Sequence, residues 1–158
     1  MKITSILFVC MANYCRSPTA EGVFRARAHA AGLADRLQID SAGTHNYRIG
    51  CEPDPRSAAC AAKRGYDLSG LRARQVVASD FAEFDHIYAM DNENLAALTR
   101  ACPPEHRHKL GLFMQYARHA DSDIVPDPYQ GEDDGFDLVL GYIEDASDGL
   151  IEHLRRHR

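Results

Sequence analysis

The feature that most restricts the fold of this chain is the regular alternation of short apolar runs with segments of helical pattern. Apolar runs predict four strands, at residues 3–9, 37–41, 86–90 and 109–113. The remaining periodic segments predict helices over residues 17–31, 54–65, 91–98 and from 134 onward. Strands that alternate with helices imply right-handed βαβ crossovers. We therefore expect an α/β fold with a parallel sheet and helices on both of its faces.

Residue types at the expected helix ends support these boundaries. Ser17 is a good N-cap, Pro18 suits the first helical position, and Gly32 suits the stop that follows. Asp54 followed by Pro55 repeats the cap-then-proline signature, and we interpret this aspartate as a helix cap only.

The size and charge of the chain exclude several classes of protein. Its 158 residues suit one domain, residues 1–158, with a substantial hydrophobic core. A hydrophobic share of 45% separates it from disordered chains. The net charge of −5 disfavours binding to nucleic acid or to an anionic membrane. An anionic ligand would therefore have to be bound by a local group of donors.

The cysteines indicate a reducing compartment. There are five of them, an odd number, and the N-terminal segment does not fit a secretory signal. Bulky Phe8 and Val9 stand where a lipoprotein processing site requires small residues. No run approaches the ~20 apolar residues of a membrane span. We therefore expect reduced thiols, a cytoplasmic location and no membrane insertion.

The segment CMANYCRSP, residues 10–18, joins the first expected strand to the first expected helix. In parallel α/β sheets, ligands bind beyond the carboxyl ends of strands, which is where Cys10 stands. Backbone N–H groups of residues 11–16 can surround an anion at the helix N-terminus, and the guanidinium of Arg16 suits two phosphate oxygens. Such surroundings lower a cysteine pKa from about 8.5 to ~3.5–7.5. Cys10 is therefore expected to attack phosphorus and form a phosphocysteine.

The spacing of Cys10 and Arg16 alone is a weak signal, because a cysteine and an arginine six positions apart occur readily by chance. The alternative is an inert buried cysteine and a solvated arginine. The location at the end of a strand favours the functional interpretation. Arg16 favours it too, because the helix dipole disfavours a cation in the first turn unless an anion is bound there.

The best candidate for a proton donor to the leaving oxygen is Asp127, in the segment VPDPYQ. Pro126 and Pro128 restrict the backbone on both sides and would hold this carboxylate in place. Tyr129 follows as an aromatic neighbour. The alternative is a plain surface turn, since Asp-Pro is a common turn dipeptide.

Several motifs together resemble those of the low-molecular-weight protein tyrosine phosphatase family. They are CMANYCRSP, SAGT at 41–44, DPR at 54–56, MD at 90–91 and DPY at 127–129, in the family's order and spacing over nearly the whole chain. The resemblance implies a single-domain, flavodoxin-like fold with a four-stranded parallel sheet. It also implies hydrolysis of phosphotyrosine without a cofactor or a metal.

The resemblance further implies roles for individual residues. Cys10 would be the nucleophile, Arg16 the phosphate fork, and Asp127 the general acid and then the base for water. The implied binding and supporting residues are Met11, Ala12, Asn13, Tyr14, Cys15, Ser17, Ser41, Tyr47 and Tyr129. Among them, Asn13 would brace the loop in a left-handed conformation, which asparagine tolerates.

Four further roles follow from the same resemblance. Ser17 would donate a hydrogen bond to the thiolate, Ser41 would support the loop from behind, and Tyr47 and Tyr129 would flank the substrate. Cys15 could trap oxidised Cys10 as a reversible disulfide. A small buried residue without a redox role is the alternative for Cys15.

The chain departs from the family pattern at two positions of the loop. Ala12 stands where the family usually has glycine, and it would strain the loop if this position required a positive φ. Tyr14 stands where a branched aliphatic residue is common, so it could narrow the pocket or stack on a substrate ring.

Other functions stay open at this point. A thioredoxin-coupled arsenate reductase shares the fold but needs a pair of relay cysteines, which are absent between Cys60 and Cys102. A non-catalytic phosphotyrosine-binding module is a second alternative. His106 and His108 suggest a metal site only weakly, and a solvated loop explains them better. The expected partner is a phosphotyrosine-containing protein, for example a tyrosine kinase, and the expected state is a monomer or a weak dimer.

Overall fold

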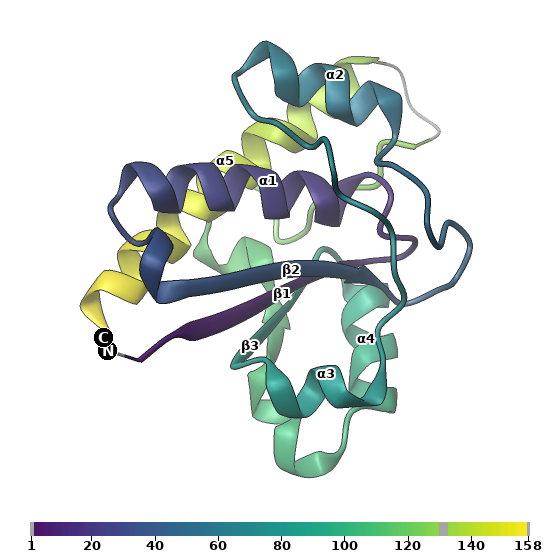
Figure 1. Cartoon of the computed structure of the whole chain (residues 1–158), viewed down its shortest axis with the longest axis vertical. Helices are drawn as coiled ribbons and strands as arrows, with labels where there is room; N and C mark the ends of the chain where they lie inside the picture. Colours follow the sequence, from purple (N-terminus) through teal and green to yellow (C-terminus); the bar gives the residue numbers. More distant parts are fainter. Residues whose placement is uncertain (1, 130–132, 158) are drawn as a thin grey trace.

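The structure is a computed structural model that describes residues 2–129 and 133–157 (Figure 1). Four parallel strands form a sheet in the order β2-β1-β3-β4. The strands are β1 (Thr4–Cys10), β2 (Leu37–Gly43), β3 (His86–Ala89) and β4 (Leu110–Leu112). This order with parallel strands confirms the expected flavodoxin-like sheet.

Helices cover both faces of the sheet. The helices are α1 (Arg16–Ala30), α2 (Pro55–Lys63), α3 (Ala78–Glu83), α4 (Asn92–Ala101) and α5 (Asp133–Arg156), with short 3-10 helices at Ala34–Arg36, Pro104–Lys109 and Phe113–Tyr116. Figure 1 shows α1, α2 and α5 on one side of the sheet and α3 and α4 on the other. Among the described residues, no helix is long and apolar enough to cross a membrane.

The central strand β1 divides its side chains between two cores. Ile6 and Phe8 belong to the larger cluster, which packs under α1 and α5, and Leu7 and Val9 belong to the cluster under α3 and α4. All four side chains are fully buried. A strand buried on both faces reads as a continuous apolar run, which is why this strand is readily predicted from the sequence.

The start of α1 differs from the prediction. The helix begins at Arg16, one residue earlier than expected, and its N-cap is Cys15, whose side chain accepts no hydrogen bond from the helix backbone. Ser17 is therefore inside the helix and Pro18 occupies the third helical position. The N-cap prediction for Ser17 was wrong because its buried hydroxyl contacts Cys10 and Asn13 instead of the helix backbone.

Two other elements were not fully predicted. Helix α3 was missed, since its six residues are too few to show a helical period. His106 and His108 lie in the 3-10 helix Pro104–Lys109 and not in a loop. The other predicted elements are present, with ends that differ by at most a few residues, and Gly32 ends α1 with a φ of 77°.

Candidate active site

Residues 10–16 lie at the carboxyl end of β1, where the chain turns into α1 (Figure 1). Cys10 ends the strand with 3% of its surface exposed, and Arg16 begins the helix with 2% exposed. Both residues line a cavity of about 420 Å³, and Asp127 lines the same cavity. The three predicted catalytic residues therefore meet at one place in the fold.

Neighbouring segments bind the carbonyl groups of this loop and leave its N–H groups free. The carbonyl oxygens of residues 10, 11 and 14 accept hydrogen bonds of 2.8–2.9 Å from the N–H groups of Thr44, His45 and Asp54. Within the described part of the chain, no N–H group of residues 11–15 donates a hydrogen bond. These N–H groups at a helix N-terminus remain available to an anion.

Gly43 allows the loop to approach β2 closely. A Cβ atom at this position would lie 2.8 Å from the Met11 carbonyl oxygen and 2.9 Å from backbone atoms of Ala12 and Asn13. Real Cβ atoms do not come so close to backbone, so any other residue would displace the loop. The motif SAGT thus supplies a glycine for close approach and, in Thr44, an N–H donor for the loop.

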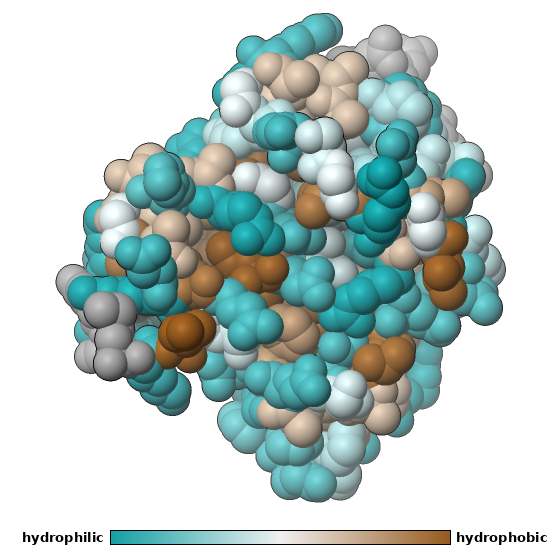
Figure 2. Space-filling model, in the orientation of Figure 1, coloured by the Kyte–Doolittle hydropathy of each residue, from teal (hydrophilic) through white to brown (hydrophobic). Residues whose placement is uncertain are grey.

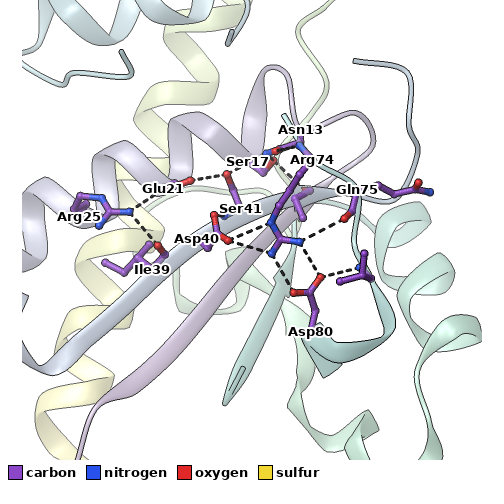
Figure 3. A network of polar contacts seen from close by, with 12 residues as sticks. Asn13, Ser17, Glu21, Arg25, Ile39, Asp40, Ser41, Arg74, Gln75 and Asp80 are labelled. Atoms are coloured by element: carbon purple, nitrogen blue, oxygen red, sulfur yellow. Dashed lines mark hydrogen bonds and ion pairs between the residues drawn. The ribbon is translucent and has the colours of Figure 1, made fainter. Parts of the chain in front are cut away.

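Asn13 holds the loop in the expected left-handed conformation, with a φ of 54°. Its Nδ2 donates to the Ser17 hydroxyl at 2.8 Å and to the Ser41 hydroxyl at 3.0 Å, and its Oδ1 accepts from the Arg74 N–H at 3.0 Å (Figure 3). Each contact comes from a different segment of the chain. The amide is therefore fixed in one orientation.

Ala12 does not have a positive φ, because Asn13 is the one residue other than glycine with that conformation in the described chain. Alanine therefore adds a methyl group to the loop without straining its backbone. The replacement of the usual glycine by Ala12 therefore does not strain the loop.

The hydrogen bonds around Asn13 extend to the nucleophile on one side and to a buried acid on the other. The Ser17 hydroxyl lies 3.1 Å from the Cys10 Sγ. The Ser41 hydroxyl donates to the Glu21 carboxylate at 2.6 Å (Figure 3). Burial raises the pKa of Glu21, although hydrogen bonds from Ser41 and Arg25 oppose this rise.

Arg16 is held by Asp91, an acid that the sequence analysis quoted in the motif MD without giving it a role in the site. Its Nη1 donates to the Asp91 Oδ2 at 2.6 Å and to the Val125 carbonyl at 3.0 Å. The other carboxylate oxygen of Asp91 accepts from the Asn94 N–H and caps α4. Burial would lower the pKa of Arg16, but Cys10 and Asp91 raise it more, so the guanidinium stays charged.

Asp127 lies at the mouth of the cavity. Its Oδ2 is 3.9 Å from the Arg16 Nη2, and 45% of its side chain is exposed. The preceding Val125 is fully buried, and its N–H donates to the Met90 carbonyl at 2.7 Å. This contact fixes the segment to the end of β3, so Asp127 lies beside Arg16 in the lining of the cavity.

Aromatic and cationic side chains form the rim. Tyr14 and Tyr129 meet edge to face with ring centroids 6.0 Å apart. The Arg48 guanidinium lies 4.3 Å from the Tyr14 ring and donates to the Tyr129 hydroxyl at 2.7 Å. Tyr47 lines the same cavity and is 65% exposed. Tyr14 therefore helps to narrow the entrance, which is one of the two effects that the sequence suggested.

Cys15 and Asp54 form a second buried pair beneath the loop. The Cys15 thiol donates to the Asp54 carboxylate at 3.6 Å, and both residues are buried. Burial raises the pKa of Cys15, and the Asp54 and Cys10 charges raise it further. Asp54 also accepts from the Arg56 N–H and side chain. Its interpretation as a helix cap only was wrong.

Sequence reasoning missed the roles of Glu21, Arg48, Arg74 and Asp91 at this site. Each is an ordinary charged residue, and no short motif distinguishes it from a solvated one. Asp91 belongs to the quoted motif MD, so the residue itself was noted. Its contact with Arg16 was not foreseen, because the two residues are 75 positions apart in the sequence. Only the packing of α1, β2, β3 and the 125–129 segment brings these residues together.

The fold and this site define an α/β protein with a loop of free N–H groups, a buried arginine and a thiol at the end of the central strand. A model of the family described as low molecular weight phosphotyrosine protein phosphatase matches residues 5–158. The chain therefore belongs to that family.

Individual relatives agree with this assignment. The chain is 46% identical to a low molecular weight phosphotyrosine protein phosphatase of Schizosaccharomyces pombe, over 97% of this chain and 98% of that protein. It is 44% identical to a Streptomyces coelicolor low molecular weight protein-tyrosine-phosphatase, over 95% of this chain and 93% of that protein. An Entamoeba histolytica protein tyrosine phosphatase superposes with a TM-score of 0.95 at 38% identity, with 98% of both chains covered.

Proposed function

We propose that the protein hydrolyses phosphotyrosine in proteins, and small aryl phosphates, through a phosphocysteine intermediate. The observation that supports this most is the convergence of Cys10, Arg16 and Asp127 on one cavity, above a loop with free N–H donors. A nucleophile, an anion site and a proton donor are the three parts that this reaction needs. The reaction requires no metal or cofactor.

In the first step, the Cys10 thiolate attacks phosphorus. A sulfur–phosphorus bond forms, the bond from phosphorus to the tyrosyl oxygen breaks, and Asp127 gives its proton to that oxygen. The N–H groups of residues 11–15 and the Arg16 guanidinium bind the three remaining phosphate oxygens. Asp91 and the Val125 carbonyl hold Arg16 by Nη1, so Nη2 faces the side of the cavity where Asp127 lies.

In the second step, water attacks the phosphocysteine. Asp127, now ionised, takes a proton from the water while the phosphorus–oxygen bond forms and the phosphorus–sulfur bond breaks. Phosphate leaves and Cys10 returns to the thiolate. Ser17 would donate its hydroxyl proton to the sulfur, which lies 3.1 Å away, and so stabilise it as a leaving group.

The rim supports an aromatic substrate. Tyr14, Tyr47 and Tyr129 line the entrance, while Cys10 and Arg16 lie buried below them. A phosphotyrosyl side chain is long enough to place its ring among the tyrosines and its phosphate in the loop. Phosphoserine is shorter and has no ring, so it would lose the aromatic contacts.

The natural substrate is then a phosphotyrosine-containing protein, and a tyrosine kinase is one candidate. All five cysteines are free thiols, which is consistent with a reducing, cytoplasmic setting. Figure 2 shows apolar residues as separate spots among hydrophilic ones on the face that it presents. That face does not resemble an obligate interface, which fits a monomer or a weak dimer.

The test compares hydrolysis of an aryl phosphate by the wild-type protein, Cys10→Ser and the control Cys51→Ser. Cys51 is an exposed cysteine, so its replacement should leave turnover unchanged. Cys10→Ser should lose turnover and still bind vanadate, because the loop N–H groups and Arg16 remain. Substantial turnover by Cys10→Ser would refute the covalent role.

The same assay separates the alternatives. A phosphotyrosine-binding module would bind the substrate without turnover in the wild-type protein. A thioredoxin-coupled arsenate reductase would oxidise thioredoxin when arsenate is added. We expect aryl phosphate turnover and no oxidation of thioredoxin by this protein.

A further inference from the structure

A second cavity lies at the opposite end of the sheet from the loop of residues 10–16. Its volume is about 690 Å³, and Thr4 at the beginning of β1 lines it. Since β1 ends six residues later at Cys10, the two cavities are separated by about 20 Å. In Figure 1 this is the end of the molecule where the N- and C-termini lie side by side.

Basic side chains from five segments of the chain line this cavity, which we call the basic cavity. They are Lys2, Arg36, His86, His108, Lys109, His153 and His157. Asp85 is the one acidic residue among the described residues of the lining. Its Oδ2 already accepts hydrogen bonds from the Ser5 N–H at 2.9 Å and the Ser5 hydroxyl at 3.2 Å.

Of the three permanent cations of the basic cavity, Lys109 donates to the carbonyls of Phe81 and Ala82 at 2.8 and 3.2 Å. Lys2 and Arg36 have no acidic partner among the described residues, although Arg36 is half-buried. Other half-buried arginines of this chain are paired: Arg27 binds Glu144 and Asp148. A group of basic residues with a single acid among them is notable in a chain with a net charge of −5.

The histidines of the basic cavity respond to this charge. Burial lowers the pKa of His86, and although Asp85 opposes the shift, His153, Lys2 and Lys109 lower it further. Burial also lowers the pKa of His153, and the charges of His157 and Arg156 lower it further. The rings of His153 and His157 lie with centroids 4.4 Å apart. The basic groups of several segments therefore face and repel one another.

We propose that the basic cavity binds a small anion that carries two or more linked phosphate groups. Guanidinium, ammonium and imidazole N–H groups are the donors that phosphate oxygens prefer. Three permanent cations and four imidazoles surround a space larger than the 420 Å³ catalytic cavity. One phosphate group would reach only some of these donors, whereas a chain of phosphates would reach several and neutralise their charge.

The test measures binding of inorganic tripolyphosphate to the full chain by calorimetry, with vanadate present to occupy the catalytic loop. We expect one tripolyphosphate per chain and shifts of the His86 and His153 imidazole signals in NMR spectra. Arg36→Gln should weaken binding roughly tenfold and leave turnover of an aryl phosphate unchanged. The control Arg100→Gln removes an exposed arginine of α4 outside the cavity and should not weaken binding.

Two results would overturn the proposal. One is no binding of tripolyphosphate when vanadate is present, and the other is equal weakening by Arg36→Gln and Arg100→Gln, which would indicate general surface attraction. The linked phosphates could belong to a nucleotide or to a free polyphosphate. Repeating the measurement with ATP in place of tripolyphosphate distinguishes these two ligands. Tighter binding of ATP would support a nucleotide that also packs on the imidazole rings, and equal binding would support recognition of the phosphate chain alone.

Discussion

The Ser41 hydroxyl donates a 2.6 Å hydrogen bond to the buried Glu21 carboxylate, and this contact sets the direction of the hydrogen bonds that lead to Cys10. Because Ser41 gives its proton to Glu21, its oxygen accepts from the Asn13 amide. The same amide also donates to Ser17, so the Ser17 hydroxyl proton can go either to the Cys10 sulfur at 3.1 Å or to the Ala42 carbonyl at 3.4 Å.

Glu21→Gln should therefore lower kcat roughly tenfold, about 1.4 kcal/mol, with little change in KM. The amide can turn its NH2 group toward Ser41 and reverse the hydrogen bonds. Alkylation of Cys10 by iodoacetamide should also shift to higher pH. The control Arg100→Gln removes an exposed arginine of α4 that lies outside these hydrogen bonds and should leave both measurements unchanged. A wild-type kcat and alkylation profile for Glu21→Gln would contradict the positioning role.

Asp91→Asn separates the two tasks of this residue. Asparagine is as good an N-cap as aspartate, so α4 and the melting temperature should be largely preserved. The charge next to Arg16 is lost, so the guanidinium is held less firmly, and kcat/KM for an aryl phosphate should fall about tenfold or more. A loss of activity that merely follows a loss of folded protein would assign Asp91 to stability alone.

Asp127→Asn should slow hydrolysis of phosphotyrosine by ~10²–10⁴-fold, because the amide keeps the shape but cannot give a proton. The loss should shrink for aryl phosphates with acidic phenols, which leave without help. A series of substrates that spans leaving-group acidity, assayed with both proteins, measures this dependence. An equal loss across the series would mean that Asp127 only shapes the segment.

Peroxide should inactivate the wild-type protein reversibly. Oxidation of Cys10 to a sulfenic acid, followed by attack of the Cys15 sulfur, forms a disulfide and releases water. Asp54 accepts the hydrogen bond of the Cys15 thiol and could take its proton. Thiol reductant should restore wild-type activity but not that of Cys15→Ser, whose Cys10 would oxidise further. Peptide mapping that always finds Cys15 reduced would exclude it from the redox chemistry.

The Asp145 carboxylate should make stability depend on pH. Burial alone would raise the pKa of Asp145, but hydrogen bonds from the N–H groups of Ala120, His119 and Arg118 lower it below its ordinary value. The native state thus favours the ionised form. Ionised Asp145 therefore stabilises the folded protein at pH values above its unfolded-state pKa, which is near 4. This contribution to the free energy of unfolding is lost as the pH falls through the lower pKa that Asp145 has in the native state.

Asp145→Asn should therefore destabilise the protein by roughly 1 kcal/mol at pH 7 and by less at pH 3, after allowance for solvent screening. Urea unfolding at both pH values measures the difference. Asp121→Asn is the control, because Asp121 is exposed and has no hydrogen bond among the described residues. An equal effect of Asp145→Asn at both pH values would contradict the assignment.

The sequence by itself indicated the four strands, four of the five α-helices, and the place of Cys10 and Arg16 at the turn from the first strand into the first helix. These are local properties: an apolar run such as residues 3–9 indicates a buried strand, and a turn into a helix offers N–H groups to an anion. The left-handed conformation of Asn13 was implied by the resemblance to the family, and asparagine tolerates this conformation better than most residues.

Only the tertiary structure decided which charged residues serve the site. Asp91 meets Arg16 across 75 positions and the Arg74 N–H meets Asn13 across 61, and nothing in a short window of sequence marks such pairs. Ser17 shows the same limit, since a local rule made it a cap while burial turned its hydroxyl toward Cys10. The physical reason is that propensity acts between neighbours in the chain, whereas hydrogen bonds and charges act between neighbours in space.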